Sequence, residues 1–280
     1  MNSAITGEML TKFITYLLEE EKCEATIEKY VRDTTQFAQW LGDRLLSKET
    51  VVLWKKRLID DGSAAATVNG KLCSLSAFLK FIGRADCRVK LLRIQRRAFR
   101  DDSRDLTKKD YERLVQTAET RGNYRIALIM ETICSTGIRV SETKYITVEG
   151  AKRGIIEIRL KGKLRTILLP KKLCRKLLKY VHEVGITRGC VFITRSGKQI
   201  SRRQIWGEMK AVCEAAGVDS RKVFPHNLRH LFAVEYYRVS RDIVKLADVL
   251  GHSSIETTRI YLITTGLEHQ KQIDSLRLVS

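Results

Sequence analysis

The sequence predicts a mainly α-helical protein with one small β-sheet, arranged as two domains. Apolar side chains show helical spacing almost throughout the first hundred residues, and a charged segment without that spacing follows. The remainder contains one closely spaced pair of β-rich runs among helical stretches. With 280 residues and 44% hydrophobic residues, the chain has enough apolar material for one large or two modest cores.

Four amphipathic helices are predicted before the charged segment. Their apolar stretches cover residues 9–17, 27–41, 51–59 and 68–82. Gly62 and Gly83 follow the last two stretches, where a helix commonly ends in glycine. The first domain, residues 1–92, is therefore expected to be a four-helix unit.

Residues 93–105 are predicted to link this domain to a second one at 106–280. The segment is rich in charge and has too little apolar content to be buried. A new helix is expected directly afterwards, because Thr107 can cap it and Asp110 lies near the positive end of the helix dipole.

The second domain is predicted to be mostly helical around one β-hairpin. A buried helical run at 126–133 ends at Gly137. The β-rich runs 155–160 and 165–169 flank Lys161-Gly162-Lys163-Leu164, which gives a hairpin with a basic tip. Further helices are expected at 171–184, 202–216, 227–238 and 242–250, with at most one more strand at 191–193.

Charge and cysteine content narrow the class of protein. The chain carries 52 Lys and Arg against 32 Asp and Glu, a formal charge of +20, which favours a phosphate-rich partner, although a merely basic soluble or ribosomal protein has the same balance. Seven dispersed cysteines without a C-x-x-C pair argue against a disulfide framework and a zinc site, and suit a reducing cytoplasm. No apolar run of about 18 residues indicates a membrane span, and no signal peptide is apparent.

Four segments combine basic residues, histidines and a tyrosine in a way that core packing does not require. They are residues 135–142, 161–163, 225–230 and 250–253, the last followed by Tyr261. Breaking a phosphodiester without a metal needs a nucleophile, cations for the non-bridging oxygens, and groups that accept and supply protons. Each of these needs has a candidate in the four segments, although each segment alone is a weak signal.

In this order, the segments resemble the catalytic signature of the tyrosine recombinases, also called the phage integrase family. The resemblance extends from about Thr107 to the end of the chain, and the helical N-terminal unit resembles the family's SAM-like core-binding domain. The two-domain layout is similar to Xer recombinases and to compact integrases of mobile elements, without room for an arm-binding domain. The resemblance implies an α+β catalytic domain and a site-specific DNA recombinase.

The resemblance also implies roles for individual residues. Two arginines would grip the scissile phosphate, a lysine would protonate the leaving 5′ oxygen, two histidines would assist at the phosphate, and a tyrosine would attack it. These residues are Arg139 and Arg229, Lys161, His226 and His252, and Tyr261. Lys163 is a close rival of Lys161, Glu142 resembles the family's supporting acidic residue, and His230 is expected to have a structural or supporting part.

Local spacing agrees with these roles. If a helix begins at Pro225, His226 and Arg229 share a face beside an N-terminus that favours anions. Gly251 is expected to end a helix, so that the next residue, His252, emerges at a junction. Ser253 and Glu256 form an expected capping pair for a short helix that carries Tyr261.

The expected partner is double-stranded DNA, bound by a tetramer that acts on two duplexes through a Holliday junction, as family members do. Neither a metal nor a nucleotide cofactor is expected, because the chain has no phosphate-binding G-x-x-x-x-G-K-[ST] loop and no clustered ligand set. A C-terminal stripe would dock on a neighbouring subunit in trans, or fold back on its own domain; it contains Leu267, Ile273, Leu276 and Leu278. Basic residues expected to contact DNA are Lys71, Lys163, Arg202 and Arg203.

Two alternatives remain open. A type IB topoisomerase uses similar residue types to nick and reseal one duplex, and a non-catalytic DNA-binding protein could share the fold. The sequence also leaves open the target site, the need for a second recombinase, and the choice between integration, excision and dimer resolution.

Overall fold

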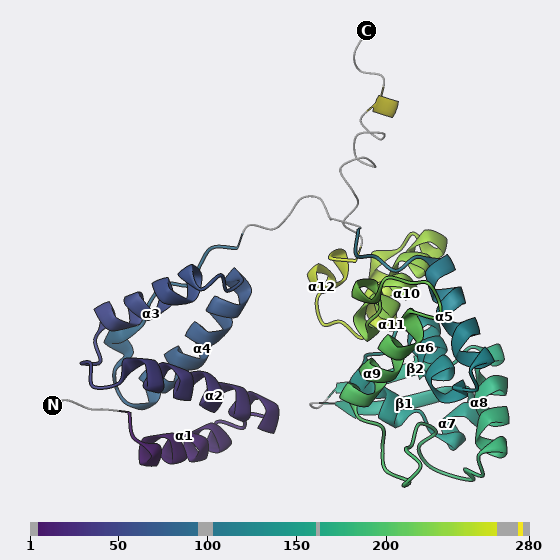
Figure 1. The fold of residues 1–280 in the computed structure, drawn as a ribbon, viewed down its shortest axis with the longest axis horizontal. Coiled ribbons are helices and arrows are strands. Elements are labelled where there is room, and N and C mark those ends of the chain that lie inside the picture. Colours follow the sequence, from purple (N-terminus) through teal and green to yellow (C-terminus); the bar gives the residue numbers. More distant parts are fainter. Residues whose placement is uncertain (1–4, 95–102, 161–162, 262–273, 277–280) are drawn as a thin grey trace. The chain divides into compact units, whose positions relative to one another are not determined.

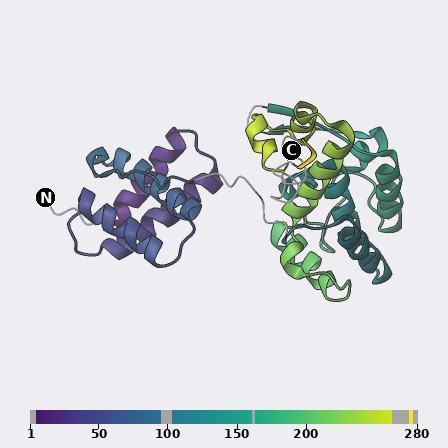
Figure 2. The same ribbon diagram turned by 90° about the horizontal axis from the view of Figure 1, so that it is seen from above.

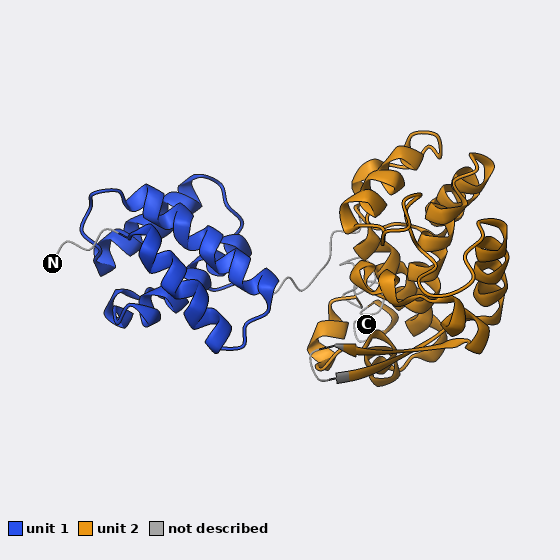
Figure 3. Cartoon of the chain, turned by 90° about the horizontal axis from the view of Figure 1, so that it is seen from below, with its two compact units in different colours: residues 1–96 blue, residues 97–280 orange. Residues whose placement is uncertain are grey.

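Helices form most of the structure, a computed structural model in which residues 5–94, 103–160, 163–261 and 274–276 are described (Figure 1). The chain divides into two units, residues 1–96 and 97–280 (Figure 3). The mainly helical fold class with one small sheet is thereby confirmed. Within the described ranges, no helix combines the length and the apolar character needed to span a bilayer.

The first unit contains the four predicted helices. They are α1 (Gly7–Glu19), α2 (Glu24–Leu41), α3 (Lys48–Asp60) and α4 (Ala65–Phe81), followed by the 3-10 turn η1 (Ala85–Cys87). An aromatic centre fills the space between them: Phe13 and Phe78 meet edge to face with ring centroids 5.2 Å apart, and Phe37 meets Trp54 at 5.0 Å. All four rings are buried, so one apolar core joins the four helices.

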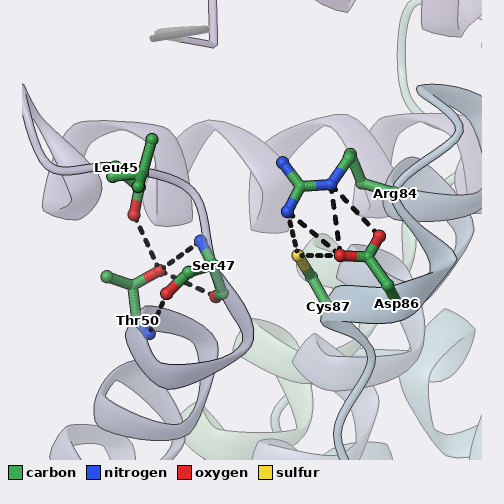
Figure 4. A network of polar contacts seen from close by, with 6 residues as sticks. All are labelled: Leu45, Ser47, Thr50, Arg84, Asp86 and Cys87. Carbon is green, nitrogen blue, oxygen red and sulfur yellow. Dashed lines mark hydrogen bonds and ion pairs between the residues drawn. The ribbon is translucent and has the colours of Figure 1, made fainter. Parts of the chain in front are cut away.

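Local polar contacts secure the ends of these elements (Figure 4). Ser47 and Thr50 form a capping box at the start of α3, in which each side chain accepts a hydrogen bond from the other's backbone N–H. After α4, the Arg84 guanidinium donates to Asp86 and, over 2.9 Å, to the Cys87 sulfur. Further along, Asn69 of α4 donates to the Leu92 carbonyl at 2.9 Å and accepts from the Leu92 backbone N–H at 2.8 Å, which holds the chain against the helix before it leaves the unit.

The second unit places α6 at its centre. Its helices are α5 (Lys108–Thr120), α6 (Tyr124–Thr136), α7 (Val148–Arg153), α8 (Lys171–Glu183), α9 (Arg202–Cys213), α10 (Pro225–Ser240), α11 (Ile243–Leu250) and α12 (Ile255–Arg259), with 3-10 turns η2 (Val140–Tyr145) and η3 (Ser220–Lys222). Helix α6 packs against α5, α8, α9 and α10. The predicted cap of α5 is confirmed, because Thr107 accepts from the backbone N–H of Asp110 at 3.1 Å.

A two-stranded antiparallel hairpin lies at one edge of this unit (Figure 2, Figure 3). Strand β1 (Ile155–Leu160) pairs with β2 (Lys163–Leu168), and Ile156 faces Ile167 in the register. The possible third strand at 191–193 is not formed: the described residues there make only an isolated bridge, because the chain turns back between Thr194 and Lys198.

Candidate active site

The end of α6 brings Arg139 into the site. Gly137 takes the left-handed conformation at φ 64° and ends the helix, as the sequence predicts. A Cβ atom at this position would lie 2.4 Å from the Phe232 ring and 2.9 Å from the Leu250 side chain. Both the backbone and the packing therefore require glycine. The chain then turns into η2, where Arg139 keeps its side chain 45% exposed.

Glu142 is buried and joins two arginines. Its Oε2 accepts from the Arg139 backbone N–H at 2.8 Å, and its Oε1 accepts from Arg139 Nη1 at 3.2 Å. Its Oε2 also accepts from Arg165 Nη1. One carboxylate thus orients the Arg139 backbone, the Arg139 guanidinium and a second guanidinium from the hairpin.

Arg229 is almost fully buried at the start of α10. Pro225 occupies the first turn of that helix, which suits proline because it has no N–H to leave unpaired. The Arg229 guanidinium donates to the carbonyls of Gly137 and, at 2.9 Å, Leu250. Burial, followed by the nearby charge of Arg139, lowers the pKa of Arg229 to about 10. It therefore remains a cation at neutral pH.

His252 follows the left-handed Gly251, which ends α11 as predicted. Its Nε2 lies 2.8 Å from Arg229 Nη2, and its Nδ1 lies 2.8 Å from Thr258 Oγ1. Because arginine can only donate, Nε2 is the acceptor in this arrangement and Nδ1 carries the proton. Burial and then the charges of Arg229, Arg139 and Arg165 lower the pKa of His252 to about 4, so the imidazole is neutral at neutral pH.

Tyr261 lies among three imidazole rings. Its ring stacks on His252 at 5.9 Å with an interplanar angle of 10°, and lies 5.6 Å from His226 and 5.5 Å from His230. Only 5% of Tyr261 is exposed. The phenol of the predicted nucleophile is thus next to the histidine that contacts Arg229, within a single copy of the chain.

The short helix before Tyr261 begins differently from the prediction. Its N-cap is Ser254, without a side-chain capping bond, so the expected pair of Ser253 and Glu256 is wrong. The fully buried Thr258 instead contacts His252 and anchors the helix to the site. The capping rule uses local spacing alone, whereas this contact depends on how α12 packs.

Arg165 is a residue of the site that the motifs did not reveal. It lies on β2 opposite Ile158, and its side chain is 9% exposed. The alternation of residues along the strand could have indicated a buried Arg165, because it shares a face with the buried Ile167. A charged residue on the buried face of a hairpin needs a partner, and Glu142 supplies it.

The remaining candidate residues lie at several places. His230 is 7% exposed, and its ring faces Tyr261. Lys71 is on α4 of the first unit, and the exposed Arg202 and Arg203 begin α9. Lys161 and the side chain of Lys163 lie outside the described residues, as does most of the C-terminal stripe, of which Leu276 is described and is 60% exposed.

The arrangement is suited to an anion with a hydroxyl group beside it. Arg139, Arg165 and Arg229 bring three guanidinium groups to one neighbourhood, while Glu142 balances one of their charges. Because its Nε2 accepts from Arg229, the neutral imidazole of His252 orients that guanidinium and adds no further positive charge to the cluster. The phenol of Tyr261 lies at the edge of this cationic cluster.

The chain belongs to the phage integrase family. The model of that family matches residues 104–265, and the model of the phage integrase N-terminal SAM-like domain matches residues 10–86. The class of protein expected from the motifs, a tyrosine recombinase with a helical N-terminal domain, is thereby confirmed.

Similar proteins span nearly the whole chain. Tyrosine recombinase XerA of Thermococcus kodakarensis is 28% identical, over 98% of this chain and 96% of its own length. Tyrosine recombinase XerC of Roseiflexus castenholzii is also 28% identical, over 94% of this chain and 90% of its own. The chain is therefore a site-specific recombinase enzyme of the tyrosine type, and its relatives include Xer recombinases.

Solved structures share the fold. XerH recombinase bound to its difH substrate aligns with a TM-score of 0.70 and 19% identity, covering 97% of this chain and 85% of that one. A lambda integrase tetramer bound to a Holliday junction aligns with a TM-score of 0.73 and 18% identity, covering 93% and 78%. At this identity, the likeness concerns the fold.

Proposed function

We propose that this recombinase cleaves double-stranded DNA through Tyr261 and rejoins it to another strand. The Tyr261 oxygen attacks the scissile phosphorus, the bond from phosphorus to the 5′ oxygen breaks, and a 3′-phosphotyrosyl link forms. The 5′ oxygen leaves as a hydroxyl after taking up a proton. A 5′ hydroxyl on the other duplex then reverses the step, so the number of phosphoester bonds is conserved.

The observation that carries the proposal is the chain of contacts from Tyr261 to His252 and on to Arg229. In this proposal Arg139 and Arg229 neutralise the non-bridging oxygens, because a guanidinium fork can donate to two oxygens and stays charged. His252 assists at the phosphate by orienting the Arg229 guanidinium through Nε2, and His226, whose ring centroid lies 5.6 Å from that of Tyr261, takes up the proton of the phenol. Lys161, with Lys163 as the rival, protonates the leaving oxygen.

DNA contact is proposed for both units. In the first unit, α2 and α4 line a groove to which Lys29, Arg32, Gln36, Gln39 and Lys71 contribute. Asp33 in that groove is paired with Lys29 at 2.7 Å, so its negative charge is offset. Long basic and amide side chains of this kind contact phosphates and base edges. Arg202, Arg203 and Lys163 are the proposed contacts of the second unit.

The proposed assembly is a homotetramer on two duplexes, supported by the lambda integrase tetramer solved on a Holliday junction. The same proposal includes exchange of the C-terminal segment between subunits. It also includes a linker at 93–105, which joins domains at 1–92 and 106–280. A role in a mobile element and a cytoplasmic location are further parts of it. The bond from Asn227 Nδ2 to the Arg104 carbonyl, 2.7 Å long, supports a structured catalytic domain from about that residue.

Covalent trapping tests the proposed function even though the target sequence is not known. The protein is incubated with sheared genomic DNA from its host, denatured and washed, and the DNA still attached is sequenced. Wild type is expected to retain fragments that share one core sequence, whereas Tyr261→Phe binds DNA before denaturation and retains none afterwards. Equal retention by both proteins would refute the proposal.

The recovered core sequence then allows the recombinase to be separated from a topoisomerase. Two labelled duplexes carrying that sequence are expected to exchange strands. Relaxation of supercoils without exchange would point to a nicking and resealing enzyme instead.

A further inference from the structure

Arg165 connects three parts of the second unit that are distant in the sequence. It lies on β2, its Nη1 donates to Glu142 in η2, and its Nη2 donates to the Val249 carbonyl at 3.2 Å in the last turn of α11. Its side chain is 9% exposed, and that of Glu142 is 2% exposed. The buried guanidinium of Arg165 therefore connects the hairpin to Glu142, which also pairs with Arg139. It connects the hairpin equally to the end of α11, which precedes His252.

The packing around Arg165 shows how closely it crosses α11. A Cβ atom on Gly251 would lie 2.6 Å from Arg165 Cδ and 2.7 Å from its Nε. Glycine at this position thus ends the helix and also leaves room for the guanidinium. Arg229 takes the next carbonyl, that of Leu250, so two arginines meet the negative end of α11 at consecutive residues.

Charge balance gives Arg165 a second effect. Glu142 is shared between Arg139 and Arg165, whereas without Arg165 its full charge would act on Arg139 alone. Arg139 is the more exposed of the two, with 45% of its side chain accessible against 9% for Arg165. Arg165 therefore offsets the carboxylate while Arg139 presents its guanidinium outward.

We propose that Arg165 is a positioning residue for the recombination reaction: with Glu142 it fixes Arg139 and the segment carrying His252 in the arrangement that receives the phosphate. This inference rests on the proposed function. It assigns Arg165 no contact with the DNA, only an effect through Glu142, Val249 and Gly251. Misplacement of such groups by about 1 Å can slow a reaction by about 100-fold.

Arg125 provides a matched control in the same unit. It also pairs with a glutamate, Glu208, at 2.5 Å, and also donates to a backbone carbonyl, that of Ile193, at 2.8 Å. Its side chain is 23% exposed, and its partners are on α9 and in the segment before it, whereas those of Arg165 are in η2 and α11. Loss of either arginine removes a comparable ion pair, but only the pair of Arg165 is at the site.

The test compares Arg165→Met with Arg125→Met in single-turnover cleavage, on a nicked duplex carrying the core sequence recovered by trapping. At saturating DNA, Arg165→Met is expected to cleave about 10- to 100-fold more slowly than wild type, and Arg125→Met within about threefold of it. DNA affinity, measured in a Tyr261→Phe background, is expected to change little in either. Equal cleavage rates for the two methionine variants would overturn the proposal.

A second readout requires no DNA and no cleavage. The groups facing His252 are Arg229 from α10, Arg139 and Glu142 at η2, Arg165 from β2, and Thr258 and Tyr261 from the C-terminal side. Removing the Arg165 cation is expected to move the His252 imidazole titration to higher pH in NMR, while Arg165→Lys keeps it near the wild-type value. An unchanged midpoint in Arg165→Met would also overturn the proposal.

If Arg165→Met does not fold, Arg165→Lys against Arg125→Lys decides the question. The lysine keeps the charge but cannot reach Glu142 and Val249 together as a fork, so cleavage about 10-fold below that of Arg125→Lys is expected. Equal rates would refute the positioning role. Failure of wild type to form any adduct would instead refute the proposed function, while the His252 titration would still test the effect of Arg165.

Discussion

Arg229 shows how a cation can remain charged in a nearly closed site. Its guanidinium has three partners that can only accept in this geometry: two backbone carbonyls and the Nε2 atom of His252. Burial lowers its pKa to about 10, which still leaves it protonated at neutral pH. The fixed geometry matters as much as the charge, because the donors are already oriented before a phosphate arrives.

Arg229→Lys should therefore impair cleavage even though the charge is kept. A lysine cannot replace the fork, and loss of one oriented donor typically slows a reaction by about 100-fold or more. Single-turnover trapping at saturating DNA measures this. Arg238→Lys is the control on the same helix, since Arg238 is exposed and pairs with Glu235 at 2.6 Å. Similar rates for the two variants would contradict the role of Arg229.

The depressed pKa of His252 predicts a pH dependence of stability. The unfolded imidazole takes up its proton near 6.5 and the folded one near 4, so the unfolded state binds more protons between these values. The contribution of His252 to the free energy of unfolding therefore falls as the pH is lowered from 6.5 toward 4. The free energy of unfolding of wild type minus that of His252→Gln, from urea titrations, should be smaller at about pH 4.5 than at about pH 7. An equal or larger difference at the lower pH would contradict the assignment.

At the scale of elements, the site is built where helices end. Helix α6 ends at Gly137 before Arg139, α11 ends at Gly251 before His252, and α10 begins at Pro225 before Arg229. The sequence predicted the two ends at glycine, because glycine is strongly preferred there, whereas the helix expected at 227–238 begins two residues earlier, at Pro225. It did not predict the contacts of Arg165 or Thr258, since these arise only when β2 and α12 pack against other elements of the unit.

Gly137→Ala tests whether packing as well as backbone conformation requires glycine. A Cβ atom would press against the ring of Phe232, so a loss of about 2–4 kcal/mol is expected from left-handed strain plus overpacking. Gly122→Ala is the matched control, because Gly122 has φ +72° but nothing within 4 Å of the place that a Cβ atom would take. Urea unfolding of both variants gives the comparison. Equal losses would show that backbone strain alone matters.

At the scale of the whole molecule, composition and motif order together predicted the class of protein. The charge of +20 pointed to a polyanion, and the ordered segments around Arg139, Arg229, His252 and Tyr261 pointed to the family. Family matches across both units agree with that prediction. The charge alone could not place the DNA surface, because basic residues are spread along the chain and only folding gathers some of them into one groove.

The groove between α2 and α4 makes a prediction about salt dependence. If Lys71 contacts a phosphate, Lys71→Gln should weaken binding to all sequences about equally and reduce the slope of log affinity against log salt by about 1. Lys12→Gln is the control in the same unit, because Lys12 is exposed on α1 and paired with Glu8 at 2.8 Å. Fluorescence polarisation over a salt series measures both. An unchanged slope for Lys71→Gln would exclude this contact.

The central claim is that Tyr261 becomes joined to a 3′ phosphate. Mass spectrometry of the trapped adduct, after protease and nuclease digestion, tests it most directly. The account predicts one modified peptide, with the nucleotide on Tyr261 through its 3′ phosphate and a 5′ hydroxyl on the released strand. A nucleotide on any other residue, or a link through a 5′ phosphate, would contradict it.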